Sequence, residues 1–273
     1  MEIHAIHTLA FSPAGATDKA VRTLGGALGK ALGLAVEEIP FTKPQDRAMD
    51  HAFGPGDLAV VGCPTYAGRM PNKIMPDFRD RLRGNGALAV AAVTYGGRAW
   101  DNSLAELAAL LTENGFQLLA AGACAARHAF TDNLGEGRPD WDDLAELRAF
   151  AGKIAEKLQA LDGPPAPLSI PGDPAAPYYV PLDTGGQPAK FLKAKPQTDL
   201  SRCSGCGACA RTCPMGAIDP RNFASVPGTC IKCQSCVRRC TRRAKFFDDP
   251  AFLSHVSMLE QHFPDRGDNA FFL

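Results

Sequence analysis

Residues 203–214 read CSGCGACARTCP, and residues 230–240 read CIKCQSCVRRC. The two stretches hold eight of the chain's ten cysteines and repeat one spacing, C-x2-C-x2-C-x3-C. Three thiolates at this spacing can wrap three corners of an iron–sulfur cubane, while the fourth points toward the other cubane. The spacing therefore predicts two [4Fe–4S] clusters with crossed ligands. We name the predicted ligand groups the Cys203 set, which comprises Cys203, Cys206, Cys209 and Cys240, and the Cys230 set, which comprises Cys230, Cys233, Cys236 and Cys213.

Eight paired cysteines could instead serve structural zinc or disulfides. C-x2-C pairs also bind zinc, and eight cysteines would make two four-ligand sites. Zinc modules, however, seldom stack three such steps and repeat them in one chain. Disulfides belong to exported proteins, and the sequence shows no basic start followed by an apolar stretch and a small-residue cleavage site. We therefore expect iron–sulfur clusters in a cytoplasmic protein.

The cysteine-rich stretch is a small part of the 273 residues, so the length predicts roughly two domains. A hydrophobic content of 45% is enough for a sizeable core. The longest apolar run, residues 87–93, is strand-sized, so no membrane span is expected. We expect an N-terminal domain over residues 1–162, a linker over 163–197, a small α+β two-cluster domain over 198–249, and a C-terminal helix and tail over 250–273.

The predicted linker is rich in proline, with nine prolines between residues 163 and 196. Proline removes backbone donors and favours extended backbone, so this segment is expected to be semi-rigid. The aromatic pair Tyr178–Tyr179 suggests that it is pinned to a surface in places.

The formal net charge of zero conceals an imbalance between the two ends of the chain. From residue 190 onward, 13 Lys and Arg stand against 7 Asp and Glu, a net charge of +6, which leaves −6 for residues 1–189. The two parts should therefore attract one another and dock, unless the imbalance is accidental.

Residues 1–161 alternate between strand-like and helix-like patterns. Apolar strand-sized runs occur at residues 3–10, 34–39, 58–63, 88–94 and 116–122. Helical periodicity occurs at residues 17–32, 71–83, 102–114 and 141–161. Alternating β and α units predict an α/β fold with a parallel sheet covered on both faces. Five strands in this length suit the flavodoxin-like doubly wound order, in which ligands bind beyond the carboxyl ends of the strands.

Three loops at such strand ends are candidates for a binding site. Residues 11–17 are small or hydroxylated and precede a helix, so their backbone can approach an anion closely. Residues 62–71 place Tyr66 between Pro64 and Gly68, where an aromatic ring can stack on a flavin. Residues 94–102 contain a glycine pair whose amides can face a flavin edge. The first loop lacks the lysine of the nucleotide-binding P-loop.

The first 160 or so residues resemble flavodoxin, and residues 198–248 resemble bacterial two-cluster ferredoxins. The whole chain resembles the fused flavodoxin–ferredoxin proteins called EFR1-family ferredoxins. The resemblance rests on the three loops followed by both cysteine motifs. It departs from the family patterns at Thr241, where ferredoxins have proline, and at Ala16, where flavodoxins often have a polar residue.

This resemblance implies non-covalent FMN, with its phosphate on residues 12–17 and its ring between the second and third loops. The residues implied to bind FMN are Ser12, Ala14, Gly15, Ala16, Thr17, Pro64, Thr65, Tyr66, Ala67, Gly68, Thr94, Tyr95, Gly96, Gly97, Arg98 and Asn102. Cys63 and Cys124 lie outside the cysteine motifs, and the default expectation for both is buried packing.

These features favour an electron carrier that moves electrons between FMN and two [4Fe–4S] clusters. No catalytic base or G-x-G-x-x-G nicotinamide fingerprint is visible, so we assign no catalytic residue and favour a carrier over an enzyme. The alternative is an FMN-dependent reductase of a quinone or other small oxidant, fed by the ferredoxin-type clusters. Arg69 and Arg98 would anchor its substrate. A zinc-bearing interaction module is a third hypothesis.

Five basic residues crowd around the last cysteine of the second motif, namely Arg238, Arg239, Arg242, Arg243 and Lys245. They form either a solvated helix face or a surface that raises the potential of the adjacent cluster and steers an acidic redox partner. The group is small and lacks interleaved aromatics, so nucleic-acid binding is not expected. The tail ends in Phe271-Phe272-Leu273, which needs a docking surface on the N-terminal domain or on a second copy in a homodimer.

Overall fold

A computed structural model describes residues 2–273. Its main sheet has the strand order β10-β7-β6-β4-β1-β2. Five of these strands run parallel to their neighbours, namely β1 (Ala5–Ala10), β2 (Val36–Pro40), β4 (Asp57–Pro64), β6 (Leu88–Tyr95) and β7 (Gln117–Ala125). Taken in chain order they follow 2-1-3-4-5, the order of the flavodoxin-like doubly wound fold. The predicted fold class is confirmed.

The sixth strand of this sheet corrects the five-stranded prediction. Strand β10 (Ala270–Phe272) comes from the C-terminal tail and pairs antiparallel with β7. Phe271 lies opposite Gly122 and stacks on Phe150 with ring centroids 4.5 Å apart. A Cβ atom at Gly122 would lie only 3.0 Å from the Phe271 ring, so glycine permits this close approach. The apolar tail therefore docks on the N-terminal sheet of its own chain.

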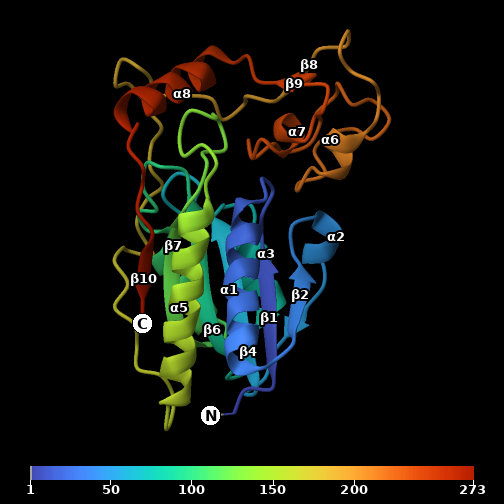
Figure 1. Cartoon of the computed structure of the whole chain (residues 1–273). Helices are drawn as coiled ribbons and strands as arrows, with labels where there is room; N and C mark the ends of the chain where they lie inside the picture. The colour runs from blue at the N-terminus through green and yellow to red at the C-terminus, as the bar shows by residue number, and fades with distance from the viewer. Residues whose placement is uncertain (1) are drawn as a thin grey trace.

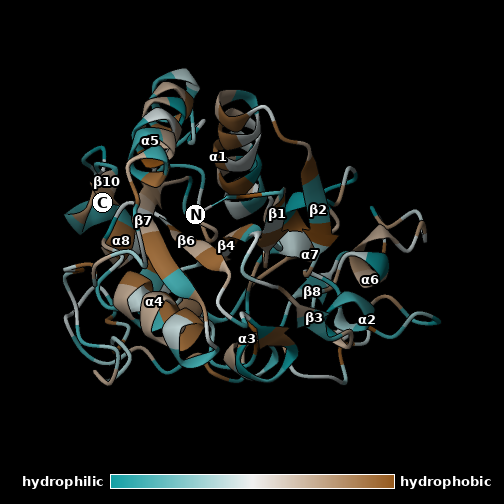
Figure 2. Cartoon of the chain, turned by 90° about the horizontal axis from the view of Figure 1, so that it is seen from below, coloured by the Kyte–Doolittle hydropathy of each residue, from teal (hydrophilic) through white to brown (hydrophobic). Residues whose placement is uncertain are grey.

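Helices cover both faces of the sheet (Figure 2). Helices α1 (Ala16–Leu32) and α5 (Trp141–Gln159) pack on one face. Helices α3 (Met75–Arg81) and α4 (Ser103–Glu113) pack on the other. Helix α1 ends at Gly33, which adopts a left-handed φ of 69°, and α5 begins with a capping box at Asp140.

The central strands are buried on both faces, because helices cover both sides of a parallel sheet. Along β4, Leu58 and Val60 face the layer of α1 and α5, whereas Ala59 and Val61 face the layer of α3 and α4. This alternation follows from the two-residue period of a strand. It fixes the register of the sheet, and hence the positions of the loops at its carboxyl edge.

The remaining elements are short, apart from one helix. They are α2 (Pro44–Arg47), β3 (His51–Ala52), β5 (Leu82–Arg83), β8 (Gln197–Thr198), α6 (Ala208–Arg211), α7 (Ser235–Arg238), β9 (Lys245–Phe246) and α8 (Pro250–His262). The expected C-terminal helix is thus present as α8. Residues 163–196, all described, form no helix and no named strand, and within residues 2–273 no helix is both long and apolar enough to cross a membrane.

The cysteine-rich region lies across the end of the sheet at which the parallel strands finish (Figure 1). The buried Arg47 guanidinium donates to the Pro214 carbonyl with an N···O distance of 2.8 Å. Met215 and Ile231 pack against the core on the α3 and α4 side. Arg238 forms a 2.7 Å ion pair with Asp132, which joins the basic end of the chain to the acidic one. The two parts are therefore in direct contact.

Candidate functional site

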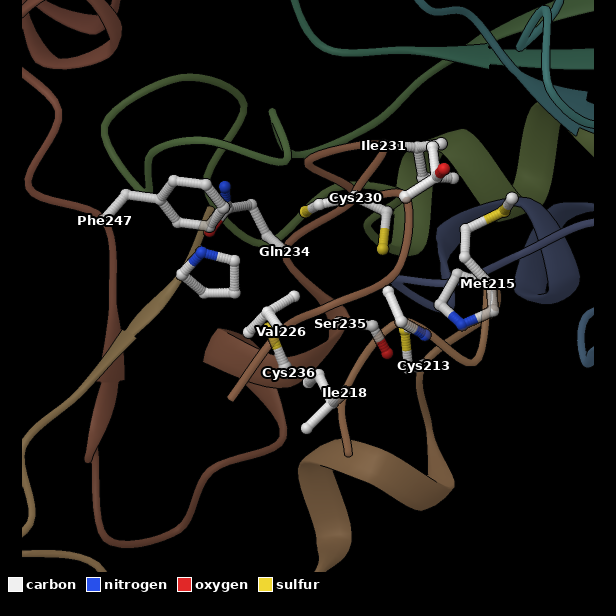
Figure 3. Close-up of a pocket in the computed structure, with 15 residues that line it drawn as sticks. Cys213, Met215, Ile218, Val226, Cys230, Ile231, Gln234, Ser235, Cys236 and Phe247 are labelled. Carbon is white, nitrogen blue, oxygen red and sulfur yellow. The ribbon is translucent and has the colours of Figure 1, made fainter. Parts of the chain in front are cut away.

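The eight motif cysteines lie around two separate pockets. Cys213, Cys230, Cys233 and Cys236 line one pocket of about 350 Å³ (Figure 3). Cys203, Cys206, Cys209 and Cys240 line the other, of about 370 Å³. Each pocket thus collects three cysteines from one motif and the fourth from the other. These are the memberships of the Cys230 set and the Cys203 set.

The two motifs share one backbone geometry. Helix α6 follows Gly207 and helix α7 follows Gln234. Both of these preceding residues adopt the left-handed backbone conformation, with φ of 70° and 61°. The amide of Ala217 donates to Cys213 Sγ at 3.3 Å, and the amide of Ala244 donates to Cys240 Sγ at 3.2 Å. The backbone after Cys240 therefore matches that after Cys213, although Thr241 stands in place of proline.

The two cysteine sets differ in their surroundings. Cys233 and Cys236 of the Cys230 set are buried, and burial raises the pKa of Cys236 to about 12. Cys206 of the Cys203 set is exposed, and its pKa is lowered by the Ala208 amide and the Ser204 hydroxyl. The Cys230 pocket thus has two buried cysteines, whereas the Cys203 pocket has none and includes one that is exposed.

The cysteine arrangement fits iron–sulfur clusters in its donor chemistry. Each pocket offers four thiols, and backbone amides point at the sulfur atoms, as cluster thiolates require. Within residues 2–273, no group of three or more His, Cys, Asp or Glu side chains is arranged to hold a single metal ion.

The first candidate FMN loop is built for an anion at the start of α1. Gly15 is the N-cap with φ of 95°, and no side chain caps the helix there. A Cβ atom at Gly15 would meet nothing within 4 Å, so this side of the backbone is open to a phosphate. Ala14 is exposed and Ala16 is partly exposed beside it. The loop therefore fits the phosphate group of FMN.

The two hydroxyls predicted to assist at this loop have partners within the protein. Ser12 Oγ accepts from the Asp18 amide at 2.9 Å. Thr17 Oγ1 lies 2.7 Å from Thr94 Oγ1 in a buried contact. Thr17 thus connects the first loop to the third, and the backbone of residues 14–16 is left as the open part of the first loop.

The second loop turns tightly after β4. Ala67 and Gly68, with φ of 48° and 77°, make a two-residue turn closed by hydrogen bonds between Tyr66 and Arg69. Thr65 bonds to Ser103 across the loop, and Pro64 is partly buried. Burial raises the pKa of the Tyr66 phenol, and the charges of the Cys233 and Cys230 thiols act in the same direction.

The third loop packs between the tail and the linker. The Tyr95 hydroxyl donates to the Asp268 carbonyl of the tail at 2.6 Å. Gly96 lies against His128, where a Cβ atom would come within 2.5 Å of the imidazole ring. Gly97 has φ of 85° and is partly exposed. The loop is therefore held from outside by segments far along the chain.

The proline-rich linker contacts Arg69 and Arg98, the two arginines predicted to anchor a substrate in the reductase alternative. Arg69 is buried and pairs with both carboxylate oxygens of Glu106, and it also donates to the Pro174 carbonyl. Arg98 pairs with Asp101 and lies 4.0 Å from the Tyr179 ring centroid. Both guanidinium groups are thus held by protein groups, which weakens the reductase alternative.

The linker also contacts the loops through its backbone. The Tyr179 amide donates to the Ala67 carbonyl at 2.8 Å, and the Asp173 amide donates to Asn102 Oδ1 at 2.8 Å. Asn102, an expected FMN ligand, therefore holds the linker in this structure. The Tyr178–Tyr179 pair was the one sequence signal for this contact, whereas nothing in the sequence marked Glu106.

The remaining cysteines and the basic residues resolve into distinct roles. Cys63 and Cys124 are buried as expected, and burial raises the pKa of Cys124 to about 12.

The five basic residues do not form one surface. Arg238 docks on the N-terminal domain and Lys245 is buried, whereas Arg239, Arg242 and Arg243 are exposed.

Comparison with known proteins gives one family match. Residues 196–219 match the family described as the 4Fe-4S binding domain, which covers the first cysteine motif. No curated protein matches the chain.

Several solved structures are similar to the N-terminal part. A flavodoxin from the domain Archaea is 17% identical with a TM-score of 0.38, covering 57% of this chain and 99% of the flavodoxin. Megasphaera elsdenii flavodoxin is 15% identical with a TM-score of 0.37, covering 55% and 98%. Rubredoxin oxygen:oxidoreductase from Desulfovibrio gigas is 18% identical with a TM-score of 0.35, covering 59% of this chain and 37% of the enzyme. The strand order and the family match together give a flavodoxin-like fold followed by a 4Fe–4S binding region.

Proposed function

We propose that this chain is an electron-transfer protein that carries FMN and two [4Fe–4S] clusters with crossed ligands. The Cys203 set would hold one cluster and the Cys230 set the other. The open backbone at residues 14–16 would hold the FMN phosphate. The chain would then be an EFR1-type fusion of flavodoxin and ferredoxin.

One observation carries this proposal, namely the direct contact between the lining of the Cys230 pocket and the flavodoxin-like part. The Arg47 guanidinium of the flavodoxin-like part donates to the carbonyl of Pro214, a residue that lines the Cys230 pocket. Met215 and Ile231, which line the same pocket, pack against the core of the flavodoxin-like part. A cluster held there would adjoin the loops proposed for the flavin, whereas the Cys203 set would lie farther out and reach the surface.

Bound FMN supplies a carrier that takes up two electrons and can release them singly, and each cluster takes one. The chain's own part is to position these groups and tune them. Amides of Ala217 and Ala244 point at thiol sulfurs, which favours the thiolate form. The linker and tail hold the second and third loops from outside. Loops held in place by the linker and the tail suit fixed positions for the cofactors more than a pocket that admits a substrate. This favours a carrier over an enzyme.

Cofactor analysis of the anaerobically purified full-length chain tests the proposal. Iron, acid-labile sulfide and FMN are quantified on one sample together with its absorption spectrum. We expect about eight irons, about eight sulfides and about one FMN per chain. Cys63→Ala is the matched control, because this buried thiol lies outside both sets and its loss should leave the iron content unchanged. Zinc in place of iron, or no FMN after reconstitution, would overturn the proposal.

A further inference from the structure

The doubled cysteine motif allows the two pockets to be compared position by position. Gly216 and Arg243 both have left-handed backbone, with φ of 58° and 51°. The amides that follow them donate to Cys213 and Cys240 at nearly equal distances. One residue farther along stand Ile218 in the first motif and Lys245 in the second. The same backbone position thus carries an apolar side chain at one pocket and an ammonium group at the other.

Both of these side chains are buried against their pockets. Ile218 lines the Cys230 pocket and is 4% exposed, and Lys245 lines the Cys203 pocket and is 3% exposed. The Lys245 ammonium donates to the Phe223 carbonyl, a neutral acceptor that leaves its charge uncompensated. Its charge is the largest influence that counters the effect of burial on the pKa of Cys209, and it acts in the same direction on Cys236 of the other set. A buried cation needs a compensating negative charge, and cluster thiolates supply it.

Other charges lie near both pockets and act in a more screened way. Lys195 and Lys232 are close to Cys230, and both are partly exposed and donate to backbone carbonyls. Arg211 and Arg242 are exposed beside the Cys203 pocket. Water screens exposed charges strongly, whereas a buried charge beside a cluster is screened little. Lys245 lines the Cys203 pocket and not the Cys230 pocket, so it is the buried charge that most distinguishes the two pockets.

Resting on the proposed function, we infer that Lys245 makes the cluster of the Cys203 set the one with the higher reduction potential. Reduction adds one negative charge to a cluster, which a buried ammonium group stabilises. Solvent access at Cys206 acts in the same direction, whereas burial of Cys233 and Cys236 disfavours the added charge. A single electron shared between the clusters would reside at the exposed end of the domain, where a one-electron acceptor protein can reach it.

The corresponding step is a one-electron transfer between the two clusters. The cluster of the Cys230 set is oxidised and the cluster of the Cys203 set is reduced. No bond is broken and no proton moves. Lys245 is buried, so it does not contact a donor or acceptor protein. Its role is to hold a positive charge beside the cluster of the Cys203 set.

Redox titration monitored by electron paramagnetic resonance tests this inference on the cofactor-loaded full chain. The wild type should show two separate one-electron potentials. Lys245→Met should lower the higher one and bring the two together, while Lys245→Arg should largely preserve the separation. Lys232→Met is the matched control, because it removes a partly exposed lysine from the second motif, and it should change the separation much less. Intact clusters in Lys245→Met with both potentials unchanged, or lowered equally, would refute the inference.

A measurement on the wild type covers the case in which Lys245→Met fails to assemble its clusters. In protein reduced by one electron, nuclear magnetic resonance of cysteine-labelled samples shows which thiolates ligate the reduced cluster. We expect the paramagnetic shifts of the reduced form on the Cys203 set, and finding them on the Cys230 set would contradict the inference. A chain without two clusters would instead defeat the proposed function, so the two failures are distinguishable.

Discussion

Tyr66 is the aromatic residue of the second loop, at the edge of the sheet on which the cysteine-rich region lies. It follows the carboxyl end of β4, and the charges of the Cys233 and Cys230 thiols act on its phenol. An aromatic ring in this place can stack on a flavin, and it also feels the charge of the Cys230 set. Its side chain therefore bears on both proposed cofactors.

Replacing Tyr66 by Ala should weaken FMN binding by about 1–3 kcal/mol, the scale of a lost aromatic stacking surface. Tyr66→Phe keeps the ring and should bind FMN almost as tightly as the wild type. Fluorescence titration of the FMN-depleted chain measures both affinities. Equal affinities for the Ala variant and the wild type would show that Tyr66 does not stack on the flavin.

At the residue scale, the sequence indicated which residues form the candidate loops, but not which residues they bond to. Small and hydroxylated residues marked the first loop, and Gly15 indeed has the open, left-handed backbone that close approach to an anion requires. Thr17, however, bonds to Thr94, and Arg69 pairs with Glu106. These partners lie 77 and 37 residues away, so no local pattern could indicate them.

At the scale of elements, each cysteine motif is a loop, a four-residue helix and a returning cysteine. Helices α6 and α7 pack against each other, and Ser235 of α7 donates to the Thr212 carbonyl beside the end of α6. This packing carries the last cysteine of each motif to the other pocket. The crossed grouping of the cysteines around the two pockets is thus a consequence of how the two elements meet.

Paired cysteine substitutions distinguish crossed from uncrossed ligation. In the crossed arrangement, Cys213→Ala with Cys230→Ala damages only one set, and one intact [4Fe–4S] cluster should remain. Cys213→Ala with Cys203→Ala damages both sets and should leave none. Iron content and the electron paramagnetic resonance of the reduced protein give the count. The reverse outcome for the two pairs would indicate that each motif holds its own cluster.

The C-terminal strand shows where element prediction from sequence ends. The spacing of apolar residues indicated α8, because periodicity is a local property. Strand β10 has three residues, and its partner β7 lies about 150 residues earlier in the chain. The apolar C-terminus indicated that the tail packs on some surface. That surface is the free edge of β7, which exists only once the sheet has assembled, so the local sequence could not identify it.

Phe271→Ala should lower the free energy of unfolding of the cofactor-loaded chain by about 1–3 kcal/mol, because it removes the ring stacked on Phe150. Leu273→Ala is the control, since this neighbouring side chain is 47% exposed. Denaturant titration followed by circular dichroism compares the two variants. A loss in Phe271→Ala no larger than in Leu273→Ala would mean that the tail contributes little to the sheet.

At the scale of the whole molecule, some of the arginines near the last cysteine hold the two parts of the chain together, and others lie on the surface. Arg238 joins the two ends of the chain through Asp132 and the carbonyls of Ala129 and His128. Arg239, Arg242 and Arg243 remain exposed near the Cys203 pocket. The charge imbalance in the sequence predicted a contact between the parts. It could not assign individual arginines to the contact or to the surface.

The exposed arginines should steer an acidic redox partner. Replacing Arg242 and Arg243 by Glu should slow electron transfer to such a partner at low ionic strength, and the rates should converge with the wild type at high salt. Arg148→Glu with Lys153→Glu makes the same change in net charge on α5 and should have little effect. Stopped-flow kinetics over a salt series measures the rates. Identical rates for both pairs at every salt concentration would leave the arginines as a solvated surface.

The most direct test of the central claim is an anaerobic reductive titration of the full chain, followed by absorption and electron paramagnetic resonance. FMN takes two electrons and each cluster takes one, so the account predicts an uptake of about four electrons per chain, with bleaching of both flavin and iron–sulfur bands. A photochemical pulse that reduces the flavin first should be followed by intramolecular reduction of the clusters, at a rate independent of protein concentration. Uptake of about two electrons, or cluster reduction only through collisions between molecules, would contradict it.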